Sequence, residues 1–279
     1  MATATPVEEK QKIVEAYIAD AVYKRDKEGL LIIIDQRTTK KGEMVNSNER
    51  DIQKIRDTFG SLGFHIHDIE DLKNLNANRL TSRFKSAVAK YNQERDENGE
   101  RKYDCLVVFL LSYSSEKNHV AASDGDYVIE TLFESIQEYF VGKPKVFFFR
   151  TPNSKEETHK VEFEVVDDED DDHEEVQRGK GTSVVIPQRA DYLVVINSHS
   201  FKEEPQSESG WRSDFIDNLT DYITENSTKD ENSIKDLMYI LTRLQARLAQ
   251  LEPWNQQEGM MPLRLTDSTL TKKLYLKRK

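Results

Sequence analysis

The stretch Lys145-Val-Phe-Phe-Phe-Arg-Thr-Pro-Asn-Ser154 decides the fold class of this chain. Its apolar residues Val146 to Phe149 predict a short buried strand, and a polar turn follows at once. In an open α/β sheet, functional groups gather where such strands end. The turn therefore marks a candidate site, with Pro152 at its centre.

Similar apolar runs occur at 30–34, 64–66, 105–111 and 192–196. Continuous apolar strands that alternate with amphipathic helices predict a buried, mostly parallel sheet with helices on both faces. The helices are expected at 13–22, 49–60, 80–91, 129–140, 215–223 and 234–248, and two further strands at 261–265 and 270–276. We therefore expect an α/β protein built on one central sheet of six strands.

Composition excludes several classes of function. The net charge of −11 argues against nonspecific binding to nucleic acid or to an anionic membrane surface. No apolar run approaches the roughly 20 residues of a membrane span, and the charged N-terminus lacks the core of a signal peptide. The single cysteine, Cys105, excludes an internal disulfide and favours a reducing compartment. We expect a cytoplasmic protein.

Several segments, taken in order, resemble the caspases, the cysteine proteases that cleave after aspartate. Gly29–Ile34 resembles the first strand of that family, and Glu49-Arg-Asp51 resembles the opening of its first helix. Tyr103–Ser112 is similar to the strand before the catalytic histidine, and Ile186–Leu193 to the opening of the small subunit. The resemblance implies a caspase-like fold, in a member that we expect to come from an invertebrate.

The resemblance also implies how the chain is divided. The regions are a short N-terminal helical segment without a death-fold domain (1–28), a large-subunit-like region (29–154), an acidic flexible linker (155–184) and a small-subunit-like region (185–279).

The catalytic groups of a caspase are missing at the positions that resemble them. A caspase needs a cysteine nucleophile and a histidine that moves the proton. Here Pro152 takes the cysteine position and Tyr113 the histidine position, while Ser114 replaces the glycine whose N–H helps to hold the oxyanion. Proline has no side-chain heteroatom, and a phenol with a pKa of about 10 is a poor proton shuttle at neutral pH. We expect no catalytic residue and no cofactor.

The pocket that would bind the substrate aspartate is changed as well. Val45 takes the position of one pocket arginine, and Arg150 replaces the pocket glutamine. The pair Trp211-Arg212 could be the one that lines the substrate groove in caspases. It could equally be a coincidence, because the adjacent Ser213 is a good N-cap for the next helix.

Other reactive residues have plainer interpretations. Cys105 opens an apolar strand and is expected to be a packing residue rather than half of a relocated Cys-His pair with His119. His65 and His67 have a spacing that could ligate zinc, but no third ligand is evident, so we expect no metal. Within the linker, Glu164-Val-Val-Asp167 resembles a caspase cleavage sequence, which makes Asp167 a candidate cleavage site.

The C-terminal strand suggests a partner. Caspases dimerise by pairing the last strands of two small subunits, and Met261-Pro262-Leu263-Arg264-Leu265 resembles that strand, with Leu270–Leu276 beside it. Arg264 and Asp267 would meet their own copies across a two-fold axis, and like charges that meet there cost stability. This favours a heterodimer with an active caspase over a homodimer.

The sequence therefore predicts a pseudo-protease that regulates an active caspase, and with it apoptosis, without predicting activation or inhibition. One alternative is a decoy that binds caspase substrates or inhibitors without cleaving them. Another is a hydrolase with different chemistry, for which Tyr113, Arg150 and Ser154 offer polar groups.

Overall fold

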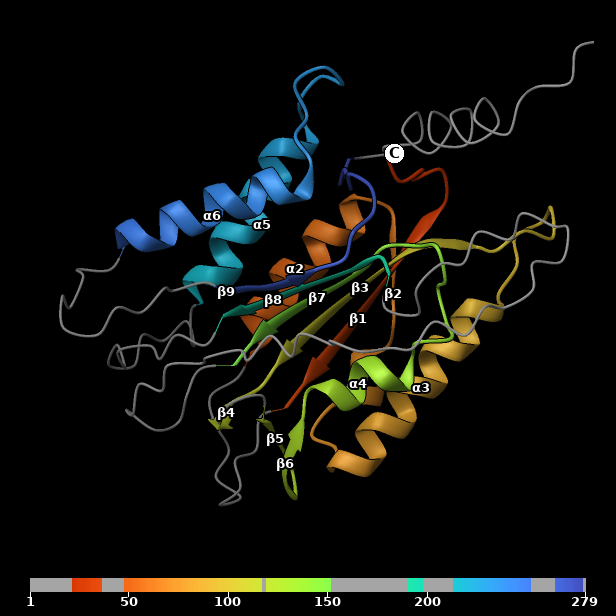
Figure 1. Cartoon of the computed structure of the whole chain (residues 1–279), viewed down its shortest axis with the longest axis vertical. Coiled ribbons are helices and arrows are strands. Elements are labelled where there is room, and N and C mark those ends of the chain that lie inside the picture. Colours follow the sequence, from red (N-terminus) through yellow and green to blue (C-terminus); the bar gives the residue numbers. More distant parts are fainter. Residues whose placement is uncertain are drawn as a thin grey trace, which may run out of the picture.

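A computed structural model describes residues 22–36, 48–116, 119–151, 190–197, 213–251 and 264–277. Its centre is a six-stranded sheet in the order β2-β1-β3-β7-β8-β9 (Figure 1). The strands are β1 (Glu28–Asp35), β2 (Phe64–Ile66), β3 (Tyr103–Leu111), β7 (Lys145–Arg150), β8 (Tyr192–Asn197) and β9 (Arg264–Ser268). The first five are parallel, and only β9 runs antiparallel to its neighbour β8.

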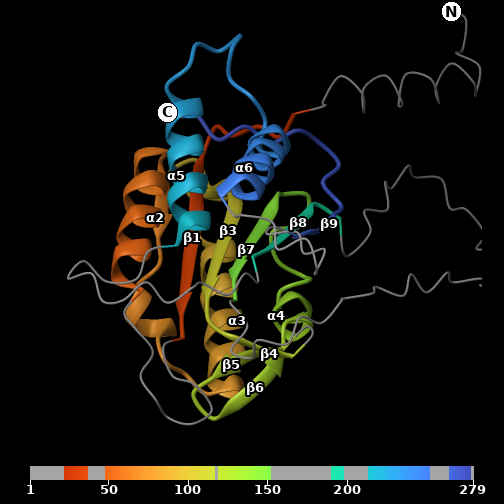
Figure 2. The ribbon, with the colours of Figure 1, turned by 90° about the vertical axis from the view of Figure 1, so that its left-hand side faces the viewer.

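Helices cover both faces of this sheet, as the apolar strands require (Figures 1 and 2). One face carries α2 (Glu49–Ser61), α5 (Asp214–Ser227) and α6 (Leu237–Leu251), and the other carries α3 (Ala77–Gln93) and α4 (Glu130–Ser135). Alternate residues of each strand enter the two cores, so that Phe148 packs on the α2 side while Phe147 and Phe149 pack on the α3 side. A one-residue slip of register would exchange these faces, so the pattern fixes the register of each strand.

A smaller antiparallel sheet follows β3, and a short 3-10 helix precedes α3. The sheet is made of β4 (Ser114–Glu116), β5 (His119–Ala122) and β6 (Gly125–Val128), and the 3-10 helix η1 spans Ile69–Leu72. Ser123 N donates a hydrogen bond to Leu75 O, and Ala77 N donates one to Asp124 Oδ1. These bonds hold the start of α3 beside the small sheet.

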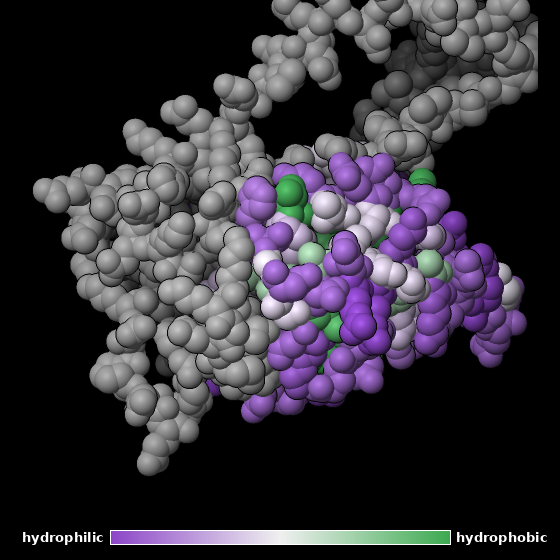
Figure 3. All heavy atoms as spheres, turned by 90° about the horizontal axis from the view of Figure 1, so that it is seen from below, coloured by the Kyte–Doolittle hydropathy of each residue, from purple (hydrophilic) through white to green (hydrophobic). Residues whose placement is uncertain are grey.

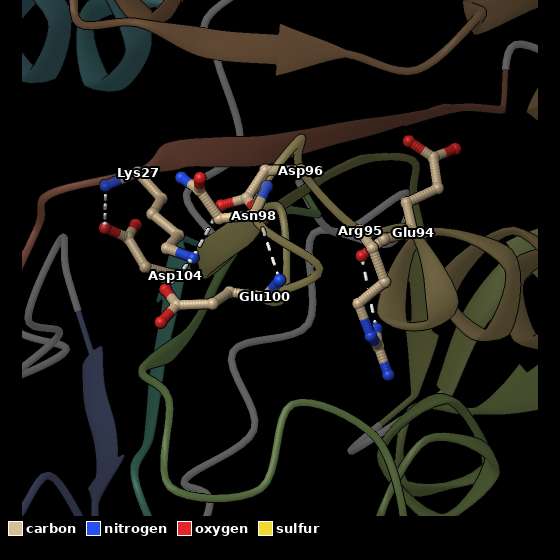
Figure 4. A network of polar contacts seen from close by, with 7 residues as sticks. All are labelled: Lys27, Glu94, Arg95, Asp96, Asn98, Glu100 and Asp104. Atoms are coloured by element: carbon tan, nitrogen blue, oxygen red, sulfur yellow. Dashed lines mark hydrogen bonds and ion pairs between the residues drawn. The ribbon is translucent and has the colours of Figure 1, made fainter.

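The amino-terminal ends of β1 and β3 are held by a polar network in the loop before β3 (Figure 4). Lys27 Nζ donates to Asp96 Oδ2 at 2.8 Å and to Glu100 Oε2 at 2.6 Å, while its backbone N–H donates to Asp104 Oδ2. Asp96 Oδ1 also accepts from the backbone N–H groups of Asn98 and Glu100. These hydrogen bonds and ion pairs therefore hold the amino-terminal ends of β1 and β3 together.

The segment before β1 also joins the C-terminal end of the chain. Tyr23 N donates to Lys273 O, and Tyr23 Oη donates to Asp191 Oδ1 at 2.5 Å. Thr271 donates to the same carboxylate oxygen through Oγ1 and to Tyr23 Oη through its backbone N–H. Residues far apart in the sequence thus meet at one buried carboxylate.

Two predicted elements differ from the structure. The strand predicted over Leu270–Leu276 is wrong, because that segment forms only an isolated bridge between Lys273 and Val22, while Leu274 and Leu276 are buried in the core. The helix predicted over 129–140 ends early, since α4 stops at Ser135 and Phe140 adopts a positive φ of 51°. The predicted N-terminal helix lies outside the described residues.

Gly29 is required by a close approach inside the sheet. A Cβ atom at this position would overlap the ring of Phe64 on the neighbouring β2. Glycine at the start of β1 therefore lets Phe64 lie against the strand, where it contacts Phe59 edge to face. Within the described ranges, no helix combines the length and apolar character needed to cross a bilayer.

Candidate functional site

The carboxyl ends of the parallel strands meet at one edge of the sheet, where Arg150 ends β7. Its side chain is only 2% exposed, although arginine is rarely buried without partners. Arg150 Nη1 donates a hydrogen bond to Asn48 Oδ1 at 2.9 Å, and Nε lies 3.6 Å from Asp51 Oδ2. The guanidinium is therefore directed at the start of α2.

Asn48 extends these contacts to β1. Its Nδ2 donates to Asp35 Oδ1 at 2.8 Å, and its backbone carbonyl accepts the first helical hydrogen bond, from Ile52. Asp35 is the last residue of β1 and is fully buried. The ends of β1 and β7 and the start of α2 are thus joined by a continuous polar chain.

Asp51 is a second buried carboxylate of this site, after Asp35. Burial raises the pKa of Asp51 to about 6, while the nearby Arg150 guanidinium and a hydrogen bond from the backbone N–H of Ser213 act in the opposite direction. Taking a carboxylate out of water disfavours its charged form, and here this effect exceeds the attraction of the guanidinium. The Arg150–Asp51 ion pair is therefore kept in place by the packing of the surrounding residues, since its two charges are removed from water.

A third buried carboxylate, Asp217, joins α5 to α2. Asp217 lies in the first turn of α5, whose N-cap is Ser213, and Ser213 Oγ accepts from Ile216 N. Lys54 Nζ lies 2.5 Å from Asp217 Oδ1, and Arg50 Nη2 lies 3.8 Å from Oδ2. These cations neutralise a carboxylate whose side chain is 3% exposed. The predicted N-cap role of Ser213 is confirmed.

Tyr113, at the predicted histidine position, follows the end of β3. Burial raises the pKa of the Tyr113 phenol, and the positive charge of Arg150 lowers it by a smaller amount. Its backbone carbonyl accepts from Ala121 N, and the hydroxyl of the preceding Ser112 donates to Ala121 O. Tyr113 therefore stays protonated at neutral pH and lies at the junction with the small sheet, which Ser114 begins.

Cys105, the only thiol in the chain, lies at the other end of β3. It is fully buried beside Gly29 of β1, and burial raises the pKa of its thiol to about 12. Leu111, at the carboxyl end of the strand, is six residues away, or roughly 20 Å at about 3.3 Å per residue. The expected packing role of Cys105 is confirmed.

His65 and His67 lie around one tyrosine. His65 Nε2 and His67 Nδ1 lie 3.4 Å and 3.2 Å from Tyr91 Oη, and His67 Nε2 lies 3.3 Å from Asp71 Oδ2. Burial lowers the pKa of His67, against the raising effect of the Asp71 carboxylate. Within the part of the chain that the structure describes, no group of three or more His, Cys, Asp or Glu side chains could hold a metal ion.

Several predicted positions lie outside the described residues: Val45, Pro152, Ser154, Asp167, Trp211, Arg212, Met261, Pro262 and Leu263. Arg264, Leu265 and Asp267 belong to β9, which pairs with β8 on one side only among the described strands. Of the remaining predictions, the structure brings Arg150 and Tyr113 to the same edge of the sheet.

Sequence reasoning missed the partners of Arg150. Asn48 and Asp51 are sequence-distant from it, as is Asp35, which Asn48 contacts, and only the fold brings these residues together. The sequence does contain a signal for part of this site. A polar residue follows the apolar run of each strand, at Asp35 and at Arg150, and the ends of parallel strands meet at one edge of the sheet.

This arrangement, a mostly parallel sheet with helices on both faces and polar groups at the strand ends, defines an open α/β protein. Residues 28–275 match the family described as Caspase domain, so the chain belongs to the caspase family.

Two solved structures are similar to the chain. A structure of pro-sf-caspase-1 is 18% identical, with a TM-score of 0.63, and the match covers 100% of this chain and 99% of that one. Caspase-1 from Spodoptera frugiperda is also 18% identical, with a TM-score of 0.64 and coverage of 93% and 94%. No curated protein sequence matches the chain significantly. At this identity, the likeness shows the fold alone.

Proposed function

We propose that this caspase-family chain is not a protease and that it regulates an active caspase by binding to it. The observation that carries the proposal is the position of Cys105. A caspase attacks its substrate with a thiolate, and the only thiol here is fully buried with a pKa of about 12. It also lies about 20 Å from the edge of the sheet where Tyr113 and Arg150 are found.

The groups at that edge support the same proposal. Tyr113 remains a neutral phenol at neutral pH, and no sequence position near it supplies a cysteine. Pro152 takes the nucleophile position in the resemblance, and it has no heteroatom to react. The edge is therefore suited to holding α2 and β7 together rather than to acyl transfer.

The edge strand β9 supports a binding role. Among the described strands, β9 has a neighbour only on the β8 side, so its other edge carries backbone groups that a further strand could pair. A partner that adds its own last strand would extend the sheet across a two-fold axis. Arg264 and Asp267 lie in this strand, and an unlike partner could complement both charges.

The decoy alternative is less well supported. A decoy would need a free cation to bind the aspartate of a substrate, and Arg150, at the pocket glutamine position, is a residue that could supply that charge. Its guanidinium is 98% buried and contacts Asn48 and Asp51. Turning it toward a ligand would leave Asp51 buried and uncompensated, which is costly. A regulator that binds through β9 needs no such rearrangement.

The test is to titrate the full chain into an active caspase and to measure turnover of a fluorogenic Asp-containing peptide. We expect turnover to rise or fall saturably with the amount of chain added, because binding one conformation of the partner shifts its population. Unchanged turnover at every ratio, together with a single free species in sedimentation, would contradict the proposal.

A further inference from the structure

Helix α3 has an unusual charge for this chain. It carries the cations Arg79, Arg83, Lys85 and Lys90 and no acidic residue, in a protein with a net charge of −11. Arg79, Arg83 and Lys90 fall on one side of the helix, since each residue advances by about 100°. All three side chains are exposed. We call these three residues the basic stripe.

The charges around the basic stripe neutralise it only in part. Arg83 Nη1 lies 2.6 Å from Asp71 Oδ1, and both side chains remain about half exposed. Lys90 Nζ lies 5.0 Å from the centre of the Tyr91 ring. Within the described ranges Arg79 has no ion pair. A hollow of about 490 Å³ lies over this part of the helix, lined by Asn78, Arg79, Ser82 and Arg83.

The charge-complementary segment lies in the same chain. Residues Asp167 to Glu175 contain eight carboxylates in nine positions, and we call them the acidic run. Their mutual repulsion raises the free energy of any compact arrangement that lacks nearby cations. The basic stripe supplies such cations.

The chain is long enough to bring the two together. Thr151 follows β7 at the carboxyl edge of the sheet, and 16 residues from there to Asp167 can extend to about 53 Å. The start of α3 lies at the same edge, because α3 connects the parallel strands β2 and β3. The chain is therefore long enough for the acidic run to contact the basic stripe.

The topology favours the face on which α3 lies. The chain passes from β3 to β7 through α4, on the α3 side of the sheet, and β8 follows β7 in the same direction across the sheet. Parallel crossovers are right-handed in about 98% of cases, so two successive crossovers in one direction use the same face. By this general rule, a crossover from β7 to β8 would lie on the α3 side.

We propose that the acidic run Asp167–Glu175 docks on the basic stripe of α3 in the same molecule. Arg79 and Arg83 are about 6 Å apart along the helix axis. Alternate residues of an extended chain, which point to one side, are about 6.6 Å apart. Alternate carboxylates of the run can therefore meet Arg79 and Arg83, and Asp167 at its end would be shielded from cleavage. This inference does not depend on the proposed function.

The experiment uses the full chain with a spin label at one introduced cysteine, His173→Cys, in the middle of the acidic run. Cys105 is fully buried, so the labelling reagent reacts at position 173 alone. We expect the amide signals of α3 near the basic stripe to lose intensity at low salt, while those of α2 on the opposite face do not. High salt, which shortens the Debye length to about 3 Å at 1 M, should restore them.

The variant Arg79→Ala/Arg83→Ala/Lys90→Ala should abolish the loss. Arg56→Ala, which removes one exposed cation from α2, is the control that should leave it intact, and the single variant Arg83→Ala, which carries the same charge change, should reduce the loss. Unfolding curves of all variants check that the fold is kept. Equal broadening of α2 and α3, or no broadening at any salt concentration, would overturn the proposal. Broadening of an isotope-labelled chain by a separate spin-labelled chain would mean docking between two copies, and would overturn the intramolecular contact.

Discussion

At the residue scale, Arg150 connects the end of β7 to the start of α2. It is an arginine that directly follows the apolar residues Val146 to Phe149, and it is buried with Asn48 and Asp51 as partners. Buried ion pairs add little net stability against an apolar replacement, but removing one partner is costly because the other charge stays buried. Arg150 therefore has a structural role that does not depend on substrate.

We predict that Arg150→Met lowers the free energy of unfolding by about 3–5 kcal/mol, because Asp51 is left without its cation. Urea unfolding followed by circular dichroism measures this. The exposed Arg56→Met is the matched control and should change stability by less than about 0.5 kcal/mol. Adding Asp51→Asn to Arg150→Met should recover part of the loss; an additive double variant would contradict the coupling.

Tyr23 has a comparable role at the opposite end of the sheet. We predict that Tyr23→Phe costs about 1–2 kcal/mol, because it removes the hydroxyl that donates to Asp191 and accepts from Thr271 N. Thr271 Oγ1 still donates to Asp191, which limits the loss. Tyr239→Phe, at a half-exposed position, is the control in the same denaturant assay, and equal effects of the two changes would show that the buried contact contributes nothing.

At the element scale, β9 is the part of the fold that the proposed function uses. Only the β8 side of β9 is paired among the described strands. Leu270–Leu276 does not cover it, because its backbone is engaged elsewhere: Lys273 O accepts from Tyr23 N and Leu274 O accepts from Leu237 N.

We predict that Arg264→Glu weakens binding to an active caspase at least tenfold, because it reverses one charge in the edge strand. Arg56→Glu, on α2, carries the same charge change and should bind as the unchanged chain does. Sedimentation velocity of mixtures measures both. Equal binding of the two variants would show that the interface does not include β9.

Most elements were predictable, for a physical reason. The runs that became β1, β3, β7 and β8 are apolar throughout, as strands buried on both faces must be. The prediction of a strand over Leu270–Leu276 was wrong because Leu274 and Leu276 alternate with other residues as they would in a strand. Both leucines are instead buried in the core on the helix-covered side of the sheet. Arg150 was assigned to the site, but its partners depend on long-range packing that no local pattern reveals.

At the scale of the whole molecule, stability depends on pH through the buried histidine. Burial lowers the pKa of His67 in the folded state, with Asp71 and Asp68 raising it and Lys90 lowering it. The unfolded chain, with a histidine pKa of about 6.5, then binds more protons than the folded one. The contribution of His67 to stability is therefore lost as the pH falls below about 6.5, whereas Asp51, whose pKa is raised to about 6 by burial, contributes in the opposite direction.

We predict that His67→Gln reduces this dependence, which is measured as the change in urea midpoint between pH 7.5 and pH 5.5. Gln keeps a polar group near Tyr91 but does not titrate in this range. His119→Gln, in the small sheet, is the comparison. If the His67 variant loses as much stability on acidification as the unchanged chain, the histidine is not the cause.

We propose that this member of the caspase family keeps the fold without the protease chemistry. The most direct measurement is hydrolysis of fluorogenic Asp-containing peptides by the purified full chain under reducing conditions, beside its Cys105→Ser variant. We expect no turnover above the buffer rate for either protein, because the only thiol is buried at the far end of β3. Turnover by the unchanged chain that disappears in the Cys105→Ser variant would contradict this expectation and show that the chain is a cysteine protease.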